Sequence, residues 1–344
     1  MAQSTPPIHA LQSIQFPLDN LIAFAGISLM TWAALASYLS AQESTLKTTV
    51  PLVQVPVSVT DKAGHFVYGL TANDFLIMDE GHAIPISVDD PDAVSSPLAV
   101  VVAVQVTDIS DSALLKIKKV GSMIGQTVVG ANGLAAVITY SDQVSVLQPL
   151  TADDDALSKS FQQLKSIPTR SGHMLDAIAK AIDILQGRPA NARSAIVIIG
   201  ESKDRGSKTT LISILPDLQR SGATVYCIEY SAFLTPMTTR ASEYKPPEGG
   251  RGWIADSITE TVHAIKQDTG KILVASTGGR TLKFETKSKL ENDLIGLGTD
   301  LHSRYMLSFT PAKSEETFHH IVVAVKKRPD LTIRARPGYW PSTQ

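Results

Sequence analysis

The hydrophobic pattern divides the chain into three zones, of which the first is a single long apolar run. Leu21 to Ala41 contains no charged residue and ends in small residues before Gln42. Within residues 1–42 it predicts a secretory signal peptide cleaved near Ala41, or an uncleaved amino-terminal membrane anchor. Either interpretation exports the rest of the chain, as a secreted, periplasmic or envelope-anchored protein. The alternative is a buried helix of a cytoplasmic protein. The apolar run has no polar face, which argues against this alternative.

The second zone, residues 50–90, alternates apolar and polar positions, as antiparallel strands with one exposed face do. The alternation runs from Pro51 to Thr60, and a strand-like Phe66 to Tyr68 follows a turn. Residues 303–340 return to the same pattern in three segments, 305–310, 319–325 and 331–336. Because a module of about 45 residues is marginal on its own, we predict that residues 303–340 complete an antiparallel β-sandwich with residues 50–90.

Between these segments, residues 97–302 alternate buried-strand and helix patterns. Leu98 to Gln105 is an unbroken apolar run, typical of a strand covered on both faces in a parallel sheet. Similar runs occupy 134–140, 194–199 and 223–230, and a short edge strand is expected at 144–147. Helices are expected at 113–126, 152–164, 174–185, 209–220, 254–268 (stopped by Gly270) and 288–301. This succession predicts an α/β domain with a doubly wound, mostly parallel sheet.

The amino-acid composition argues against several classes of function. The chain has 344 residues, enough for two domains, and 31 basic against 33 acidic residues, which argues against nucleic-acid binding. Its single cysteine, Cys227, excludes an intramolecular disulfide and is expected to be a buried structural thiol. No nucleophile elbow, Walker loop, zinc spacing or dinucleotide-binding glycine motif is present. We therefore expect no enzymatic activity; a hydrolase with an unrecognised site is the least favoured alternative.

The residues that could bind a ligand lie where the first buried strand ends. Asp108, Ser110 and Ser112 form an Asp-x-Ser-x-Ser sequence directly after it, and ligands of open α/β sheets bind outside the carboxyl ends of the strands. The acidic triplet 153–155 instead sits where a helix should begin, behind Thr151 as the expected N-cap, so we interpret it as helix capping and not as a metal site.

Several short signatures occur in a fixed order along residues 50–340. They are residues 57–64 with 69–75, then 147–153, 175–178, 225–228, 276–280 and 336–339. In this order they resemble the bacterial VWFA-related proteins known mostly from acidobacterial genomes, in which the α/β part is a von Willebrand factor A domain. The resemblance implies an exported protein with a Rossmann-like A domain, in a family whose biochemical role is largely unassigned.

The resemblance also implies a divalent-cation site of the adhesion type, holding Mg²⁺ or Mn²⁺. Its first loop is matched by Asp108, Ser110 and Ser112. If the strand before them ends at Gln105, however, Asp108 lies one turn beyond the loop and the site is lost. A polar strand end that binds no metal is then the alternative.

The other two loops depart from the family pattern. Where the family has a threonine, this chain has Ser171 or His173, of which the histidine alone fits better as a residue that starts a helix. Where the family has an aspartate, Glu201 follows Gly200. Hydroxyls and water-linked carboxylates would leave the cation a position for an acidic group of a protein or peptide partner.

Two functions from different classes follow. The first is an exported protein-interaction module that binds its partner at the carboxyl edge of the sheet, bordered by the loop 233–252. The second is a metal-free structural or envelope-assembly scaffold, whose contacts are made by the edges of the β-sandwich.

Overall fold

The computed structural model describes residues 52–89, 91, 96–107, 109–230, 268–311 and 317–341. The apolar run 21–41, Asp108, the loop 233–252 and the expected helix 254–268 lie outside the described residues. No helix in the ranges just given is long and apolar enough to cross a membrane.

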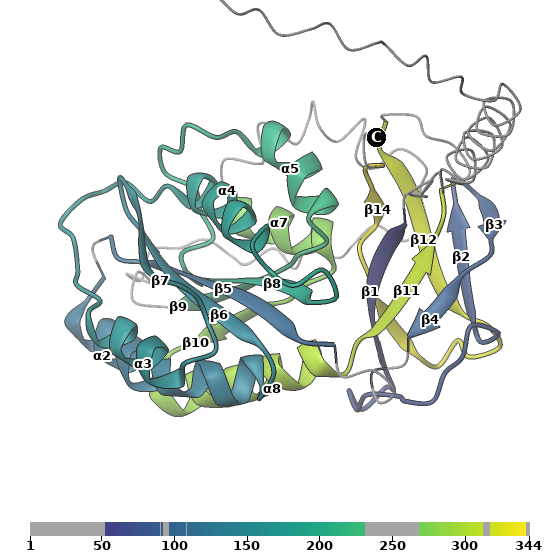
Figure 1. Ribbon diagram of the computed structural model, residues 1–344, viewed down its shortest axis with the longest axis horizontal. Helices are drawn as coiled ribbons and strands as arrows, with labels where there is room; N and C mark the ends of the chain where they lie inside the picture. The colour runs from purple at the N-terminus through teal and green to yellow at the C-terminus, as the bar shows by residue number, and fades with distance from the viewer. Residues whose placement is uncertain are drawn as a thin grey trace, which may run out of the picture. The chain divides into compact units, whose positions relative to one another are not determined.

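The larger sheet is built around the apolar run that opens the third zone of the sequence. All eight residues of β5 (Leu98–Gln105) are buried, as expected for a strand covered on both faces. The strand order is β10-β9-β8-β5-β6-β7, so the chain winds outward from β5 in both directions (Figure 1). Neighbouring strands are parallel except β7, which runs antiparallel to β6. The doubly wound fold class is confirmed. The other strands are β6 (Leu134–Tyr140), β7 (Val144–Thr151), β8 (Arg193–Gly200), β9 (Thr224–Tyr230) and β10 (Thr281–Phe284).

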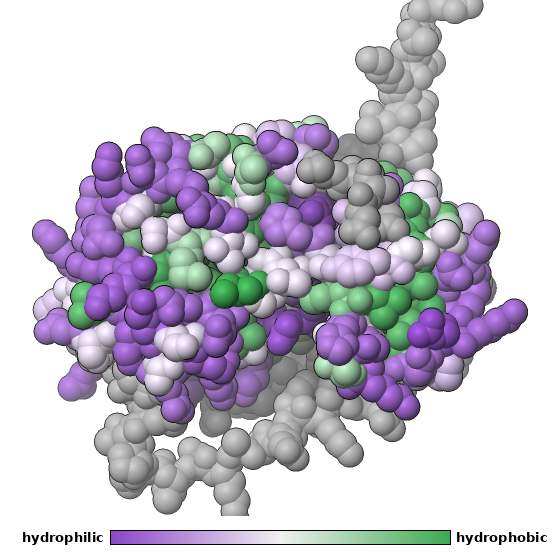
Figure 2. All heavy atoms as spheres, turned by 90° about the horizontal axis from the view of Figure 1, so that it is seen from below, coloured by the Kyte–Doolittle hydropathy of each residue, from purple (hydrophilic) through white to green (hydrophobic). Residues whose placement is uncertain are grey.

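Helices cover both faces of this sheet and enclose two apolar cores (Figure 1). One face carries α2 (Asp111–Met123), the π-helix η1 (Ile124–Val129), α3 (Asp154–Gln162) and α8 (Lys287–His302). The other carries α4 (Met174–Leu185), α5 (Leu211–Arg220) and α7 (Thr269–Thr277). The outer surface of the first group is mostly polar, with scattered apolar side chains such as Leu115 and Ile295 (Figure 2). Such scattered residues are normal for a soluble surface and mark no apolar docking patch there.

A β-sandwich is made from the two ends of the described chain. One sheet has the order β13-β1-β11-β4 and the other β14-β12-β2-β3, and all pairings are antiparallel. Val55 pairs with Leu307 and Ile77 with Val323, so in both sheets a strand from one end of the described chain pairs with a strand from the other. The predicted sandwich is confirmed. Its strands are β1 (Val53–Thr60), β2 (Phe75–Asp79), β3 (His82–Ile84), β4 (Ser87–Asp89), β11 (Tyr305–Phe309), β12 (His319–Val325), β13 (Thr332–Arg334) and β14 (Gly338–Tyr339).

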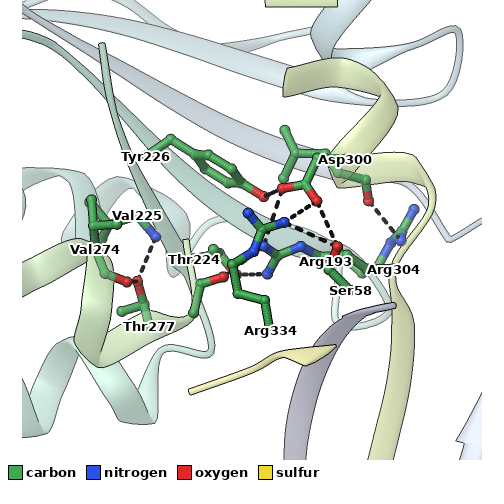
Figure 3. A network of polar contacts seen from close by, with 12 residues as sticks. Ser58, Arg193, Thr224, Val225, Tyr226, Val274, Thr277, Asp300, Arg304 and Arg334 are labelled. Carbon is green, nitrogen blue, oxygen red and sulfur yellow. Dashed lines mark hydrogen bonds and ion pairs between the residues drawn. The ribbon is translucent and has the colours of Figure 1, made fainter. Parts of the chain in front are cut away.

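A buried ionic network connects the sandwich with the α/β part. Asp300 of α8 is fully buried and accepts hydrogen bonds from Tyr226 of β9 (2.6 Å) and Ser58 of β1 (2.9 Å). Arg304 (3.2 Å) and Arg334 of β13 form ion pairs with the same carboxylate, toward which these side chains converge in Figure 3. Burial alone would raise the pKa of Asp300, but the two guanidinium groups and the hydrogen bonds hold it below its usual value.

Three local expectations were wrong. Gly270 does not stop a helix but lies in the first turn of α7, where its N–H donates to the Ser202 carbonyl (2.7 Å). The N-cap of α3 is Asp153 and not Thr151, because the Asp153 carboxylate reaches two helix N–H groups. Phe66 forms only an isolated bridge with Thr60. The expected edge strand is confirmed as β7, which continues beyond 147 to residue 151 and forms a hairpin with β6.

Candidate functional site

The first loop of the candidate site begins where β5 ends, at Gln105. This is the end point that we expected to displace Asp108 from the site and to favour the metal-free alternative. Strand-like pairing continues beyond this point, since the Val106 N–H donates to the Tyr140 carbonyl (3.0 Å) and the Ile167 N–H donates to the Val106 carbonyl (2.8 Å). The buried Thr107 hydroxyl donates to the carbonyl of Ser171. These bonds fasten the loop after β5 to the loop that precedes α4.

The structure brings together Ser110 and Ser112, whose Oγ atoms lie 3.2 Å apart on the exposed surface. Ser110 is the N-cap of α2, because its Oγ accepts a hydrogen bond from the Ala113 N–H (3.3 Å). The two serines therefore present neighbouring hydroxyls at the start of a helix. Asp108, the third member of the predicted first loop, lies outside the described residues.

The second loop contributes Ser171 and His173. Besides its carbonyl contact with Thr107, Ser171 donates its N–H to Thr169 Oγ1 (3.2 Å). His173 occupies the residue before α4 but makes no side-chain capping bond, and its Nδ1 lies 3.5 Å from Asp176 Oδ2. Its N–H donates to the Ser141 carbonyl (2.8 Å). His173 is thus a residue that starts a helix, and its ring faces a carboxylate.

The third loop follows β8 and carries Glu201. The Glu201 N–H donates to the buried Gln105 side chain (2.8 Å), which places the loop beside the end of β5. Its carboxylate pairs with Arg205 at 2.9 Å and is largely shielded from solvent. Gly172 and Arg205 exchange two backbone hydrogen bonds (3.0 and 2.9 Å), so the second and third loops are also joined.

Two aspartates that sequence reasoning missed support these loops. Asp204 Oδ1 accepts from the Leu175 N–H (3.0 Å) and so caps α4 from a different loop. Asp176 accepts from the N–H groups of Lys208 (3.1 Å) and Thr209 (2.8 Å). Burial alone would raise the pKa of Asp176, but these hydrogen bonds and the nearby His173 lower it below its usual value. No local pattern signals either role, because the partners lie 29 to 33 residues away.

Comparisons with known proteins find similarity at the level of fold. No sequence-family model matches the chain, and no curated protein sequence matches it. Among solved structures, the vWF domain of the type V pili tip protein Mfa5 from Porphyromonas gingivalis is 15% identical with a TM-score of 0.30, over 35% of this chain and 44% of that one. This chain thus matches less than half the length of the pilus protein.

Two further bacterial structures are similar over more of the chain. A von Willebrand factor type A protein from Catenulispora acidiphila is 10% identical with a TM-score of 0.42, over 86% of this chain and 75% of that one. The conserved hypothetical protein BatB from Bacteroides thetaiotaomicron is 12% identical with a TM-score of 0.37, over 60% of this chain and all of the other. The strand order around β5, with the antiparallel β7 at one edge and helices on both faces, decides the fold class. The chain has the fold of a von Willebrand factor A domain.

The described candidate side chains at the carboxyl edge of this A domain offer oxygen donors, of which only those of Ser110 and Ser112 are in contact with each other. Hydroxyls of Ser110 and Ser112 with a carboxylate from Glu201 are oxygen ligands of the kind that Mg²⁺ and Mn²⁺ prefer. Among the side chains that the structure describes, no three His, Cys, Asp or Glu residues gather at this edge; the group that does lies in the sandwich.

Proposed function

We propose that this chain is an exported protein-interaction module and not an enzyme. It binds a protein or peptide partner at the carboxyl edge of the A-domain sheet, through Mg²⁺ or Mn²⁺. The observation that carries the proposal is the neighbouring pair of hydroxyls on Ser110 and Ser112, in a loop that is hydrogen-bonded to the two others of the site. Export rests on the uncharged apolar run 21–41.

The residues assigned to the cation are Asp108, Ser110 and Ser112 from the first loop, Ser171 or His173 from the second, and Glu201 from the third. When bound, the cation supplies a positive charge that accepts an oxygen ligand from an acidic partner side chain. The chain's own contribution is rigidity. Because the three loops are tied by backbone bonds, they hold the ligands in place before the partner arrives, which lowers the entropic cost of binding.

A second function, a metal-free envelope scaffold, is favoured by the ion pair of Glu201 with Arg205 (2.9 Å). A carboxylate that already has a guanidinium partner needs no cation to balance its charge. In that case the partner contacts are made by the edges of the β-sandwich, and the carboxyl edge of the A domain is a polar strand end.

Calorimetric titration of Mg²⁺ and Mn²⁺ into the full-length chain separates the two functions. An adhesion-type site gives saturable binding that Asp108→Ala and Ser112→Ala weaken by roughly tenfold or more, as loss of a ligand should. Asp183→Ala is the matched control, since Asp183 is an exposed carboxylate on α4 whose contact is with Lys180. The Asp183→Ala variant should bind Mg²⁺ and Mn²⁺ with the same affinity as the unmodified chain.

Arg205→Ala gives a further discrimination. Removing the guanidinium leaves Glu201 without its ion-pair partner, so a cation site that uses Glu201 should bind more tightly in this variant. No saturable binding in the unmodified chain and none in Arg205→Ala would contradict the cation-dependent module and support the scaffold.

A further inference from the structure

We propose that Asp79, Glu80 and His319 form a metal site in the β-sandwich, separate from the A-domain edge, for Zn²⁺ or a related divalent transition-metal ion. One ligand atom of each residue lies within 4.8 Å of the others. Asp79 ends β2, Glu80 begins the turn to β3, and His319 begins β12. The β2–β12 pairing brings the histidine to the two acidic residues from 240 positions away in the sequence.

Backbone contacts fix the third ligand. The Glu80 N–H donates to the His320 carbonyl (3.0 Å), and the His320 N–H donates to Glu80 Oε1 (2.6 Å). Glu80 and Gly81 both have positive φ, 48° and 83°, as a two-residue hairpin turn requires. The carboxylate of Glu80 is thereby held beside the start of β12, with one oxygen anchored and the other available as a ligand.

The buried histidine faces one carboxylate, that of Asp79, at a long distance. His319 and Asp79 are each only 7% exposed. His319 Nδ1 lies 3.4 Å from Asp79 Oδ1, longer than the ~2.7–3.2 Å of an ordinary N–H···O hydrogen bond. Its Nε2 is buried and has no hydrogen-bond partner among the described residues. Nε2 is a different ring atom from Nδ1 and is not the ligand in this site. An ion between Nδ1 and Asp79 Oδ1 would replace their long contact with two short coordinate bonds, and the geometry points to such a ligand.

The distance between the Asp79 and His319 ligand atoms is also the one expected around a metal ion. Two ligand atoms about 2.1 Å from a tetrahedral zinc ion lie about 3.4 Å from each other, and this is the distance between Asp79 Oδ1 and His319 Nδ1. An imidazole with two carboxylates is a donor set for zinc and similar transition metals, whereas Ca²⁺ and Mg²⁺ prefer oxygen ligands throughout. Three protein ligands leave a fourth position, which the exposed side of Glu80 opens to water.

Tyr339 orients the two buried ligands. Its hydroxyl donates to Asp79 Oδ2 (2.9 Å), which leaves Oδ1 directed at the histidine. Its ring stacks on the imidazole with 5.1 Å between centroids, which fixes the plane of His319. Outer hydrogen bonds of this kind hold metal ligands in one orientation and raise affinity.

The test measures Zn²⁺ by equilibrium dialysis and Co²⁺ by visible absorption, using the full-length chain without a histidine tag. The unmodified chain should bind one equivalent, with the intense absorption of a low-coordinate cobalt site. Glu80→Gln and His319→Gln should each weaken binding by roughly tenfold or more. His65→Gln is the matched control: His65 forms a similar pair with Asp61 (3.2 Å), but that pair is exposed and belongs to no three-residue group among the described side chains.

Two more variants keep the proposal falsifiable. Asp108→Ala alters the A-domain edge and should leave Zn²⁺ binding unchanged, so loss in this variant would assign the ion to the other site. If His319→Gln fails to fold, Glu80→Gln decides, because Glu80 is exposed. Equal binding by Glu80→Gln and the unmodified chain, or no binding up to about 1 mM metal, would overturn the proposal and leave a histidine–aspartate ion pair.

Discussion

Asp176 and Asp204 show how single side chains hold the carboxyl edge together. Each accepts backbone N–H groups from a segment other than its own, Asp204 at the start of α4 and Asp176 in the approach to α5. Helix starts carry N–H groups without partners, and a carboxylate is the strongest acceptor for them. The two aspartates therefore lock the second and third loops of the candidate site against each other.

Asp176→Asn should reduce the acid sensitivity of the fold. The pKa of Asp176 is lower in the folded chain than its ordinary value of 3.8, so its contribution to stability is present above that value and is lost as the pH falls toward the folded pKa. Between about pH 5 and pH 2.5 the free energy of unfolding should therefore fall less in the variant than in the unmodified chain. Urea unfolding at a series of pH values measures this. Asp183→Asn, with a side chain 62% exposed, is the control and should change the slope less.

At the same scale, the sequence could predict residues whose partners are local and could not predict the others. The acidic triplet was interpreted as helix capping, and Asp153 does cap α3 through the N–H groups of Asp155 and Ala156. Asp79 and His319 are 240 residues apart in the sequence, and they meet only because β2 pairs with β12. No local sequence pattern could therefore predict their contact.

At the scale of elements, continuous apolar runs predicted the inner strands of the sheet, because a strand buried on both faces has few polar positions. A glycine caused one of the errors. Gly270 was interpreted as a helix stop, but it serves a close approach: an added Cβ would lie 2.9 Å from Ser202 Oγ. Gly125 lies in η1, beyond the end of α2, where an added Cβ would overlap the Asp154 carboxylate. A glycine required by packing cannot be distinguished in the sequence from one that ends a helix.

Two glycines of α8 test this distinction directly. Gly296→Ala should stabilise the protein by up to about 1 kcal/mol, because nothing lies within 4 Å of the added Cβ and alanine favours a helix. Gly298→Ala should destabilise it by about 2 kcal/mol or more, because the Cβ would lie 2.0 Å from the Thr127 carbonyl oxygen. Thermal unfolding of both variants measures the difference. A destabilised Gly296→Ala together with a neutral Gly298→Ala would contradict the packing of α8 on η1.

At the scale of the whole molecule, the A domain is inserted between the two halves of a sandwich, and the alternation at both ends predicted this. What the sequence did not reveal is the network that joins the two parts. Its members come from β1, β9, α8, β13 and, for Arg304, the link between α8 and β11. The sequence pattern of these segments does not indicate that their charged side chains meet. Arg304 lies four residues after Asp300, which is an ordinary helical spacing, and only burial makes the pair unusual.

Asp300→Asn should lower the free energy of unfolding by about 3–5 kcal/mol, because it leaves the guanidinium groups of Arg304 and Arg334 without a counter-charge in a buried site. Asp293→Asn is the matched control on the same helix: its carboxylate is also buried, but its partner Lys289 is 52% exposed and can turn to solvent, so the cost should be smaller than that of Asp300→Asn. Urea unfolding followed by circular dichroism measures both variants. Because the network connects the sandwich with the A domain, Asp300→Asn should also separate one cooperative transition into two, whereas Asp293→Asn should keep a single one. Equal losses in the two variants would show that the network does not couple the parts.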